Sequence, residues 1–270
     1  MPTAAIRGTT IHYERTGAGP DLLFIHGMCG DSRVWDQQVE LLAGGYTCIT
    51  YDRRGHSRSS GGGAGESDAI HADDGAALIQ ALGLDPVVVA SSGGARIAVE
   101  LLRRRPDTVR GAVLSEPPML GLAPDAAQPF LAELRPRIEH ALAQQGPGAA
   151  VDAFFSYVCP GLWRRLGDTA KDRYRANAAA MLAELDVPPN PIASDDLAGL
   201  HTPALVLSGA DSHCTLRTIA TVLVRALPDA RFMELAECGH VTYAEQPEQF
   251  AAAVAAFAGE LFTPAARRTR

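Results

Sequence analysis

A serine at the junction between a predicted strand and a predicted helix is the first candidate for chemistry. The segment Val-Val-Val-Ala-Ser-Ser-Gly-Gly-Ala runs from an apolar stretch into a helical pattern. With Ser92 at the turn, the small residues Ala90 and Gly94 lie two positions before and after it. A sharp strand-to-helix turn strains the backbone at its centre and tolerates only small neighbours. We therefore predict Ser92 as the nucleophile rather than Ser91, although an ordinary glycine-rich turn would show a similar pattern.

A histidine beyond the last predicted strand is the candidate general base. His240 lies in Glu-Cys-Gly-His, directly after the predicted strand Arg231–Leu235. A loop in that place can bring an imidazole to the hydroxyl of Ser92, which is a weak nucleophile without an adjacent base. We predict that His240 accepts the serine proton. Of the eight histidines in the chain, it is the one in this context.

The segment Phe-Ile-His-Gly-Met, which ends an earlier predicted strand, supplies candidates for an oxyanion hole. Backbone N–H groups aimed at a developing negative charge stabilise the transition state of acyl transfer. We predict that the N–H groups of Met28 and Gly93 perform this role. His26 is predicted to orient the loop rather than to take part in the reaction.

An alternation of short apolar runs with helical patterns predicts the elements that would position these residues. It indicates an α/β fold with a mostly parallel central sheet and helices on both faces. Ala4–Arg7 and Thr10–Arg15, around Gly8, predict a hairpin at the sheet edge. The other predicted strands are Asp21–His26, Tyr46–Tyr51, Pro86–Ala90, Gly111–Ser115, Ala204–Ser208 and Arg231–Leu235. The predicted helices are Val34–Leu42, Ala69–Leu82, Gly93–Arg105, Thr215–Leu227 and Glu248–Phe257.

A long stretch in the middle of the chain lacks strand signals. Pro129–Gln145, Ala149–Val158 and Thr169–Leu185 show helical spacing, separated by Pro and Gly clusters. We predict a helical cap insertion over residues 117–200, within a core domain formed by residues 1–116 and 201–270. A separate domain is the less favoured alternative, because the strand pattern resumes at Ala204 and completes the same sheet.

Together these motifs resemble the α/β-hydrolase family over nearly the whole chain. The matching segments are His26-Gly27, Asp52-Arg53-Arg54-Gly55, Ser92 with its small neighbours, and Gly239-His240, in the family's order. The resemblance implies an α/β-hydrolase fold and a hydrolytic activity with a serine nucleophile. Branches of the family that use an aspartate nucleophile, such as epoxide hydrolases and haloalkane dehalogenases, do not fit Ser92.

The acid of the expected triad departs from the family's usual pattern. The resemblance places it three residues after Gly209, where this chain has Ser212, and Asp211 lies one residue early. Glu116, directly after the predicted strand Gly111–Ser115, is the second candidate. The nucleophile and Glu116 segments are locally similar to those of zearalenone-type lactonases. We therefore predict Glu116 as the acid and keep Asp211 as the alternative.

Composition limits the partners and the cellular location. The chain of 270 residues carries a formal net charge of −7, which disfavours nucleic acids and anionic membrane surfaces as partners. Five scattered cysteines and the lack of an apparent signal peptide favour a cytoplasmic protein with reduced thiols. No metal or organic cofactor is implied. The oligomeric state stays open, and a homodimer is one of the alternatives.

We expect a serine hydrolase that cleaves a carboxylic ester or lactone of a small, largely apolar molecule through an acyl-enzyme at Ser92. The aromatic and apolar side chains Phe130, Phe154, Phe155, Tyr157, Trp163 and Met181 of the predicted cap would line its pocket or pack within the cap. Alternatives on the same fold are a cofactor-free perhydrolase, a C–C bond hydrolase, an acyltransferase, and a lyase or cyclase of secondary metabolism. A small-molecule receptor with a relict site is the non-enzymatic alternative.

Overall fold

The computed structural model describes residues 2–63, 65–187 and 192–263. Within them, one sheet of eight strands has the order β1-β2-β4-β3-β5-β6-β7-β8. The strands pair in parallel from β4 onward, whereas β1 pairs antiparallel with β2, and β2 antiparallel with β4. Their bounds are β1 Thr3–Ile6, β2 Thr9–Thr16, β3 Asp21–Ile25, β4 Thr47–Tyr51, β5 Val87–Ser91, β6 Gly111–Ser115, β7 Ala204–Gly209 and β8 Ala230–Leu235. The predicted fold class and the terminal hairpin are confirmed.

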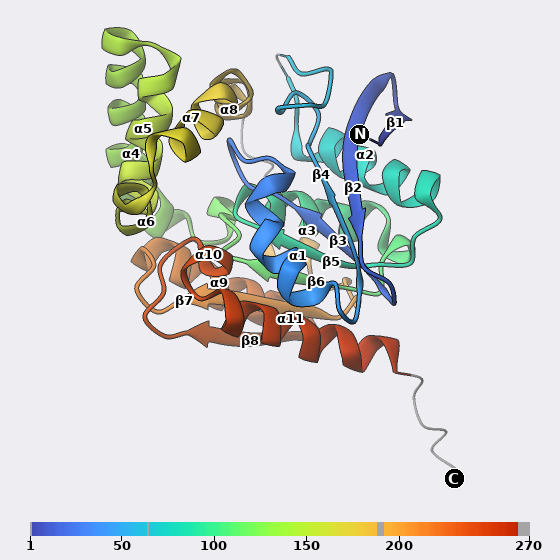
Figure 1. Ribbon diagram of the computed structural model, residues 1–270. Helices are drawn as coiled ribbons and strands as arrows, with labels where there is room; N and C mark the ends of the chain where they lie inside the picture. Colours follow the sequence, from blue (N-terminus) through green and yellow to red (C-terminus); the bar gives the residue numbers. More distant parts are fainter. Residues whose placement is uncertain (1, 64, 188–191, 264–270) are drawn as a thin grey trace.

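Helices cover both faces of the sheet, as the continuous apolar strands require. Alternate residues of each strand enter different core clusters: Leu23 and Val88 pack with α2, α3 and α9, whereas Leu22 and Val87 pack with α1 and α11. Helices α1 and α11 therefore share one face in Figure 1, and α2, α3 and α9 share the other. The bounds are α1 Asp36–Leu42, α2 Asp68–Leu82, α3 Gly93–Arg104, α9 Cys214–Ala226, α10 Thr242–Glu245 and α11 Pro247–Phe262.

A group of helices between β6 and β7 lies at one end of the sheet (Figure 1). Its members are α4 Pro124–Gln145, α5 Pro147–Val158, α6 Pro160–Arg165, α7 Asp168–Ala176 and α8 Ala178–Asp186. No strand occurs in the parts of 117–200 that the structure describes, from which 188–191 are missing. The helical content predicted for this stretch is thus present, and its separation from the core as a domain stays a prediction.

Two details of this helical group differ from the sequence prediction. The single helix expected over Thr169–Leu185 is divided into α7 and α8 at Asn177, whose side chain binds the core. The short helix α6 was not expected, because Pro160-Gly161 indicated a break. Proline is favoured in the first turn of a helix, where its missing N–H costs no hydrogen bond, and Pro160 begins α6 in this way.

Candidate active site

Ser92 occupies a strained turn between β5 and α3. Its φ of 53° and ψ of −125° are unusual for a residue with a side chain. Hydrogen bonds hold this backbone, because the Ser92 N–H donates to Ser115 O (2.9 Å) and the Ser92 carbonyl accepts from Ala95 N (2.8 Å). A Cβ at Gly94 would lie 2.3 Å from the backbone oxygen of Ile25, so only glycine fits there. Ser91, by contrast, is the last residue of β5 and is buried.

His240 brings its imidazole to the Ser92 hydroxyl. Its Nε2 lies 2.9 Å from Ser92 Oγ, and its Nδ1 lies 3.2 Å from Glu116 Oε2. The loop after β8 packs tightly against the end of β7, since a Cβ at Gly209 would lie 2.2 Å from the carbonyl oxygen of Gly239. Only 6% of His240 is exposed. Close packing therefore fixes the ring between a hydroxyl and a carboxylate.

Glu116 lies directly after β6, where its backbone also adopts a positive φ of 50°. Its Oε1 accepts hydrogen bonds from Ser208 Oγ (2.7 Å) and from the Gly209 N–H (2.8 Å). Its Oε2 accepts from Ser212 Oγ (2.6 Å) as well as from His240. The buried carboxylate is thus fully coordinated by donors, which fixes its direction toward the imidazole.

The alternative acid, Asp211, lies elsewhere. Asp211 is exposed, and its backbone N–H donates to Cys238 O (2.8 Å). Ser212, at the position where the family usually has its acid, donates its hydroxyl to Glu116. The structure therefore brings Ser92, His240 and Glu116 into one hydrogen-bonded series, and within the described residues Asp211 takes no part in it.

Met28 lines a small space beside Ser92, and Gly93 lies next to Met28. A Cβ built on Gly93 would lie 3.5 Å from the Met28 nitrogen, so the two residues are close neighbours. The Gly93 N–H is also the first of α3, where N–H groups lack partners within the helix. Gly27 packs against the turn, since a Cβ there would lie 3.1 Å from Ser92 Cβ.

His26 faces away from this space and supports the loop. Its Nε2 accepts from the Arg53 N–H (3.0 Å), and its Nδ1 lies 2.9 Å from Gly27 O. Burial, together with the positive charge of Arg53, holds the pKa of His26 well below 6.5. The imidazole is therefore neutral near pH 7.

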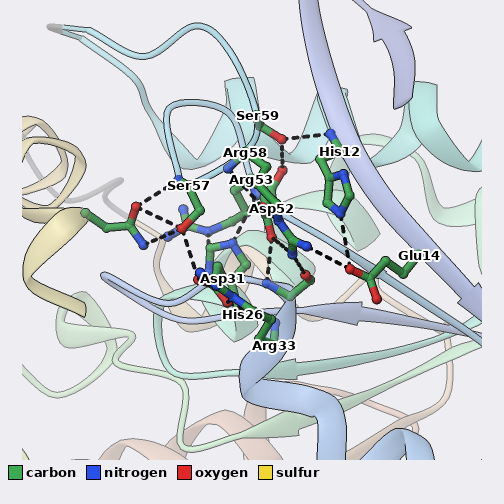
Figure 2. A network of polar contacts seen from close by, with 12 residues as sticks. His12, Glu14, His26, Asp31, Arg33, Asp52, Arg53, Ser57, Arg58 and Ser59 are labelled. Atoms are coloured by element: carbon green, nitrogen blue, oxygen red, sulfur yellow. Dashed lines mark hydrogen bonds and ion pairs between the residues drawn. The ribbon is translucent and has the colours of Figure 1, made fainter. Parts of the chain in front are cut away.

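The Asp52–Ser59 loop after β4 is fixed by buried polar contacts (Figure 2). Asp52 accepts from the Ser32 N–H (2.8 Å) and from Arg58 Nε (2.8 Å). Burial raises the pKa of Asp52, but the hydrogen bonds from Arg58 and Ser32 outweigh it and lower the pKa to about 2. The family motif Asp52-Arg53-Arg54-Gly55 therefore has a positioning role in this structure.

A buried ion pair that the sequence did not indicate joins this loop to α8. Arg53 is fully buried, and its Nη2 donates to Glu184 Oε1 at 2.8 Å. Burial raises the pKa of Glu184, but the surrounding basic groups, Arg53 foremost, together outweigh it and lower the pKa to about 2. Asn177, at the start of α8, adds a second link, because its Oδ1 accepts from the Ser57 N–H (2.8 Å) and its Nδ2 donates to Cys29 O.

Two spaces lie beneath the helical group, and Ser92 lines the smaller one. A small pocket of about 30 Å³ is lined by Ser92 and His240 and by Phe154, Phe155 and Trp163 of the helical group. A cavity of about 650 Å³ extends between α4, α8 and α3, and Met28 lines both spaces. Of the other three side chains that we considered for the pocket, Phe130 packs against Tyr157, and Met181 is fully buried.

The described residues offer no group of three or more His, Cys, Asp or Glu side chains suited to a metal ion. None of the helices in the same residues is long and apolar enough to cross a membrane.

Comparisons with known proteins agree with this fold. The model of the alpha/beta hydrolase family matches residues 22–253. A non-heme haloperoxidase of Rhodococcus erythropolis is 30% identical over 230 residues, which cover 78% of this chain and 82% of that protein. The uncharacterized hydrolase YraK of Bacillus subtilis is 38% identical over 123 residues, 44% of this chain and 45% of its own length. A thermophilic esterase from Thermogutta terrifontis has a TM-score of 0.79 at 26% identity, with 97% of each chain covered.

Proposed function

The chain belongs to the alpha/beta hydrolase family, and on that basis we propose that it hydrolyses a carboxylic ester or lactone through an acyl-enzyme at Ser92. The observation that carries the proposal is the series of contacts from Ser92 Oγ to His240 Nε2 (2.9 Å) and from His240 Nδ1 to Glu116 (3.2 Å). This series supplies a nucleophile, a base and an orienting carboxylate. The esterase of similar structure supports the same reaction class.

In the proposed reaction, His240 Nε2 accepts the hydroxyl proton of Ser92 as Oγ attacks the carbonyl carbon. The N–H groups of Met28 and Gly93 hold the oxyanion. His240 then gives its proton to the leaving alcohol as the ester C–O bond breaks. A water molecule next loses a proton to His240 and attacks the acyl-enzyme. Return of that proton to Ser92 Oγ releases the acid, while Glu116 stabilises the charged imidazole throughout.

The helical group α4–α8 would serve as the cap of this site, as the sequence predicted for residues 117–200. Its aromatic side chains line the pocket at Ser92, and its apolar side chains Leu131, Leu134, Ile138, Leu142 and Leu182 line the larger cavity. A cavity of about 650 Å³ accommodates a small organic molecule. We infer that the apolar part of the substrate lies there. The local resemblance to zearalenone-type lactonases stays a prediction.

A panel of p-nitrophenyl esters and lactones, assayed with wild type, Ser92→Ala and Ser91→Ala, tests the proposal. We expect Ser92→Ala to lose at least about 10³-fold in kcat/KM, while Ser91→Ala keeps most of the activity. A fluorophosphonate probe should label wild type and spare Ser92→Ala. Unchanged turnover or labelling in Ser92→Ala would contradict the acyl-enzyme.

The haloperoxidase relative favours a second candidate reaction, perhydrolysis. Hydrogen peroxide, instead of water, would attack the acyl-enzyme and release a peracid, with Ser92 regaining its proton. Monochlorodimedone bromination in the presence of acetate, bromide and peroxide measures this reaction. Activity that exceeds ester hydrolysis and disappears in Ser92→Ala would favour the second candidate.

A further inference from the structure

Glu184 presents a buried carboxylate oxygen that has no partner among the described residues. Only 5% of its side chain is exposed, and Oε1 accepts from Arg53, but Oε2 has no hydrogen-bond donor within reach. A buried acceptor without a partner costs free energy, and the cost is larger for a charged group. Such an oxygen is suited to accept a hydrogen bond from a donor group on a bound ligand.

The position of this oxygen is close to the proposed oxyanion hole. Glu184 Oε2 lies 3.9 Å from the point where a Cβ on Gly93 would be, and that point lies 3.5 Å from the Met28 nitrogen. Glu184 also lines the cavity of about 650 Å³, next to Leu182 and Leu185 of the same helix. An atom attached to the carbon beside the scissile carbonyl could therefore reach Oε2.

Two of the donors near Glu184 are directed elsewhere. Arg96 directs its Nε and Nη2 to the carboxylate of Asp68 at 3.0 and 2.9 Å. His56 Nε2 lies 3.5 Å from Glu184 Oε1, but His56 Nδ1 contacts Arg54 O at 3.0 Å and therefore carries the proton of the neutral ring. Burial, and to a smaller extent the charge of Arg53, lowers the pKa of His56 to about 4. The ring therefore has no second proton to donate near pH 7. Arg53 Nη1 and both ring nitrogens of His71 lack hydrogen-bond partners, but neither Arg53 nor His71 lines the cavity in the described residues.

Charge gives a second reason for a donor on the substrate. The carboxylate of Glu184 lies beside the place where negative charge develops on the substrate oxygen, and the two repel each other. Arg53 offsets part of this repulsion from the far side of Glu184. A substrate N–H or O–H bound to Oε2 would draw the remaining negative charge of the carboxylate away from the oxyanion.

We propose that Glu184 is a specificity-determining residue, which selects esters or lactones with a hydroxyl or N–H group on the carbon next to the scissile carbonyl. This inference rests on the proposed function and adds a substrate class to it. The donor binds Glu184 Oε2, and the apolar remainder of the molecule lies against Leu134, Ile138 and Leu142.

Three esters of equal chain length test this inference: p-nitrophenyl hexanoate, its 2-hydroxy derivative and its 2-methoxy derivative. The methoxy compound is similar in size to the hydroxy compound but has no donor. Because hydrogen bonds to charged groups are the stronger class, we expect wild type to prefer the 2-hydroxy over the 2-methoxy ester by about 10- to 100-fold in kcat/KM. A wild-type ratio near one would overturn the inference, whatever happens in any variant.

The variant Glu184→Gln separates recognition from structure. Its Oε1 must still accept from Arg53, so the amide NH₂ replaces Oε2 and an acceptor becomes a donor. We expect the preference for the 2-hydroxy ester to disappear, while Asp186→Asn, on the same wall of the cavity, retains it. Equal losses on all three esters in Glu184→Gln, with the ratio preserved, would make Glu184 purely structural. No turnover of any ester by wild type would instead overturn the proposed function.

Discussion

Replacing Glu116 with glutamine should separate the two candidate acids. The Oε1 position faces two donors, Ser208 Oγ and the Gly209 N–H, so the glutamine oxygen must lie there. The amide NH₂ then takes the Oε2 position and donates to His240 Nδ1. That contact moves the imidazole proton to Nε2, which can then no longer accept the hydroxyl proton of Ser92. The substitution also removes the negative charge that stabilises the imidazolium.

The expected loss in kcat/KM for Glu116→Gln is about 10²- to 10⁴-fold, or about 3–5 kcal/mol of transition-state stabilisation. Asp211→Asn should stay within about threefold of wild type, because an exposed side chain away from His240 supplies no comparable interaction. The assay is p-nitrophenyl butyrate hydrolysis, with thermal unfolding as the control for folding. A larger loss in Asp211→Asn than in Glu116→Gln would refute the assignment of the acid.

A rescue experiment makes the same reasoning sharper. Ser212 Oγ lies 2.6 Å from the Glu116 oxygen that contacts His240, so a carboxylate at residue 212 would point to the same place. In a Glu116→Ala background, Ser212→Asp should recover at least about tenfold in kcat/KM. If the double variant is no more active than Glu116→Ala, the loop after β7 cannot present an acid to this imidazole.

Three further predictions concern the oxyanion site, the buried histidines and the cavity. Gly93→Ala should fold normally, since its Cβ meets nothing within 3.4 Å, but should lose about 10²-fold or more in kcat/KM by crowding the Met28 N–H. His56 and His71 have pKa values lowered by burial and by Arg53 to about 4 and about 3. Below pH 6.5 the unfolded chain therefore binds protons that the folded chain does not, so each histidine should cost about 2 kcal/mol of stability between pH 7 and pH 5. Urea unfolding measures this loss, and His71→Leu should reduce it by that amount; equal losses in both proteins would contradict the pKa shift. Ile138→Trp should reduce the length of the longest acyl chain that the protein hydrolyses, while the rate of p-nitrophenyl acetate hydrolysis stays within about threefold of wild type. An unchanged dependence on chain length would place the substrate outside this cavity.

The central strands β3 to β7 could be predicted from the sequence because their apolar runs are buried on both faces. The predicted Gly111–Ser115 agrees with β6, and Pro86–Ala90 is one residue displaced from β5. The proximity of Glu116 to His240 follows from the same reasoning, since β6 neighbours β5 and the carboxyl ends of parallel strands share one edge. The catalytic roles of these residues stay predictions until the variants are measured.

The ion pair between Arg53 and Glu184 could not be predicted in this way. The two residues are 131 positions apart, and Glu184 stands in an ordinary helical pattern with no distinguishing neighbours. Only the fold of α4–α8 over the sheet brings them together. The family motif around Arg53 was the one available signal, and it indicated a loop at this position but no partner for Arg53.

The buried polar contacts of α8 have a consequence for how the site works. Directional polar contacts, in addition to apolar packing, fix one arrangement of the helical group on the sheet. Asn177 holds the loop that carries Met28, through its contacts with Cys29 O and Gly30 O. Glu184 holds the loop that carries Arg53, and Arg53 in turn donates to Gly27 O (3.2 Å) beside the Ser92 turn. Both ends of α8 are thus connected to the segment 27–30, of which the Met28 N–H holds the oxyanion in the proposed mechanism. The covering helix and the proposed oxyanion site are therefore positioned by the same contacts, so we expect that a substitution in α8 can change activity without touching Ser92, His240 or Glu116.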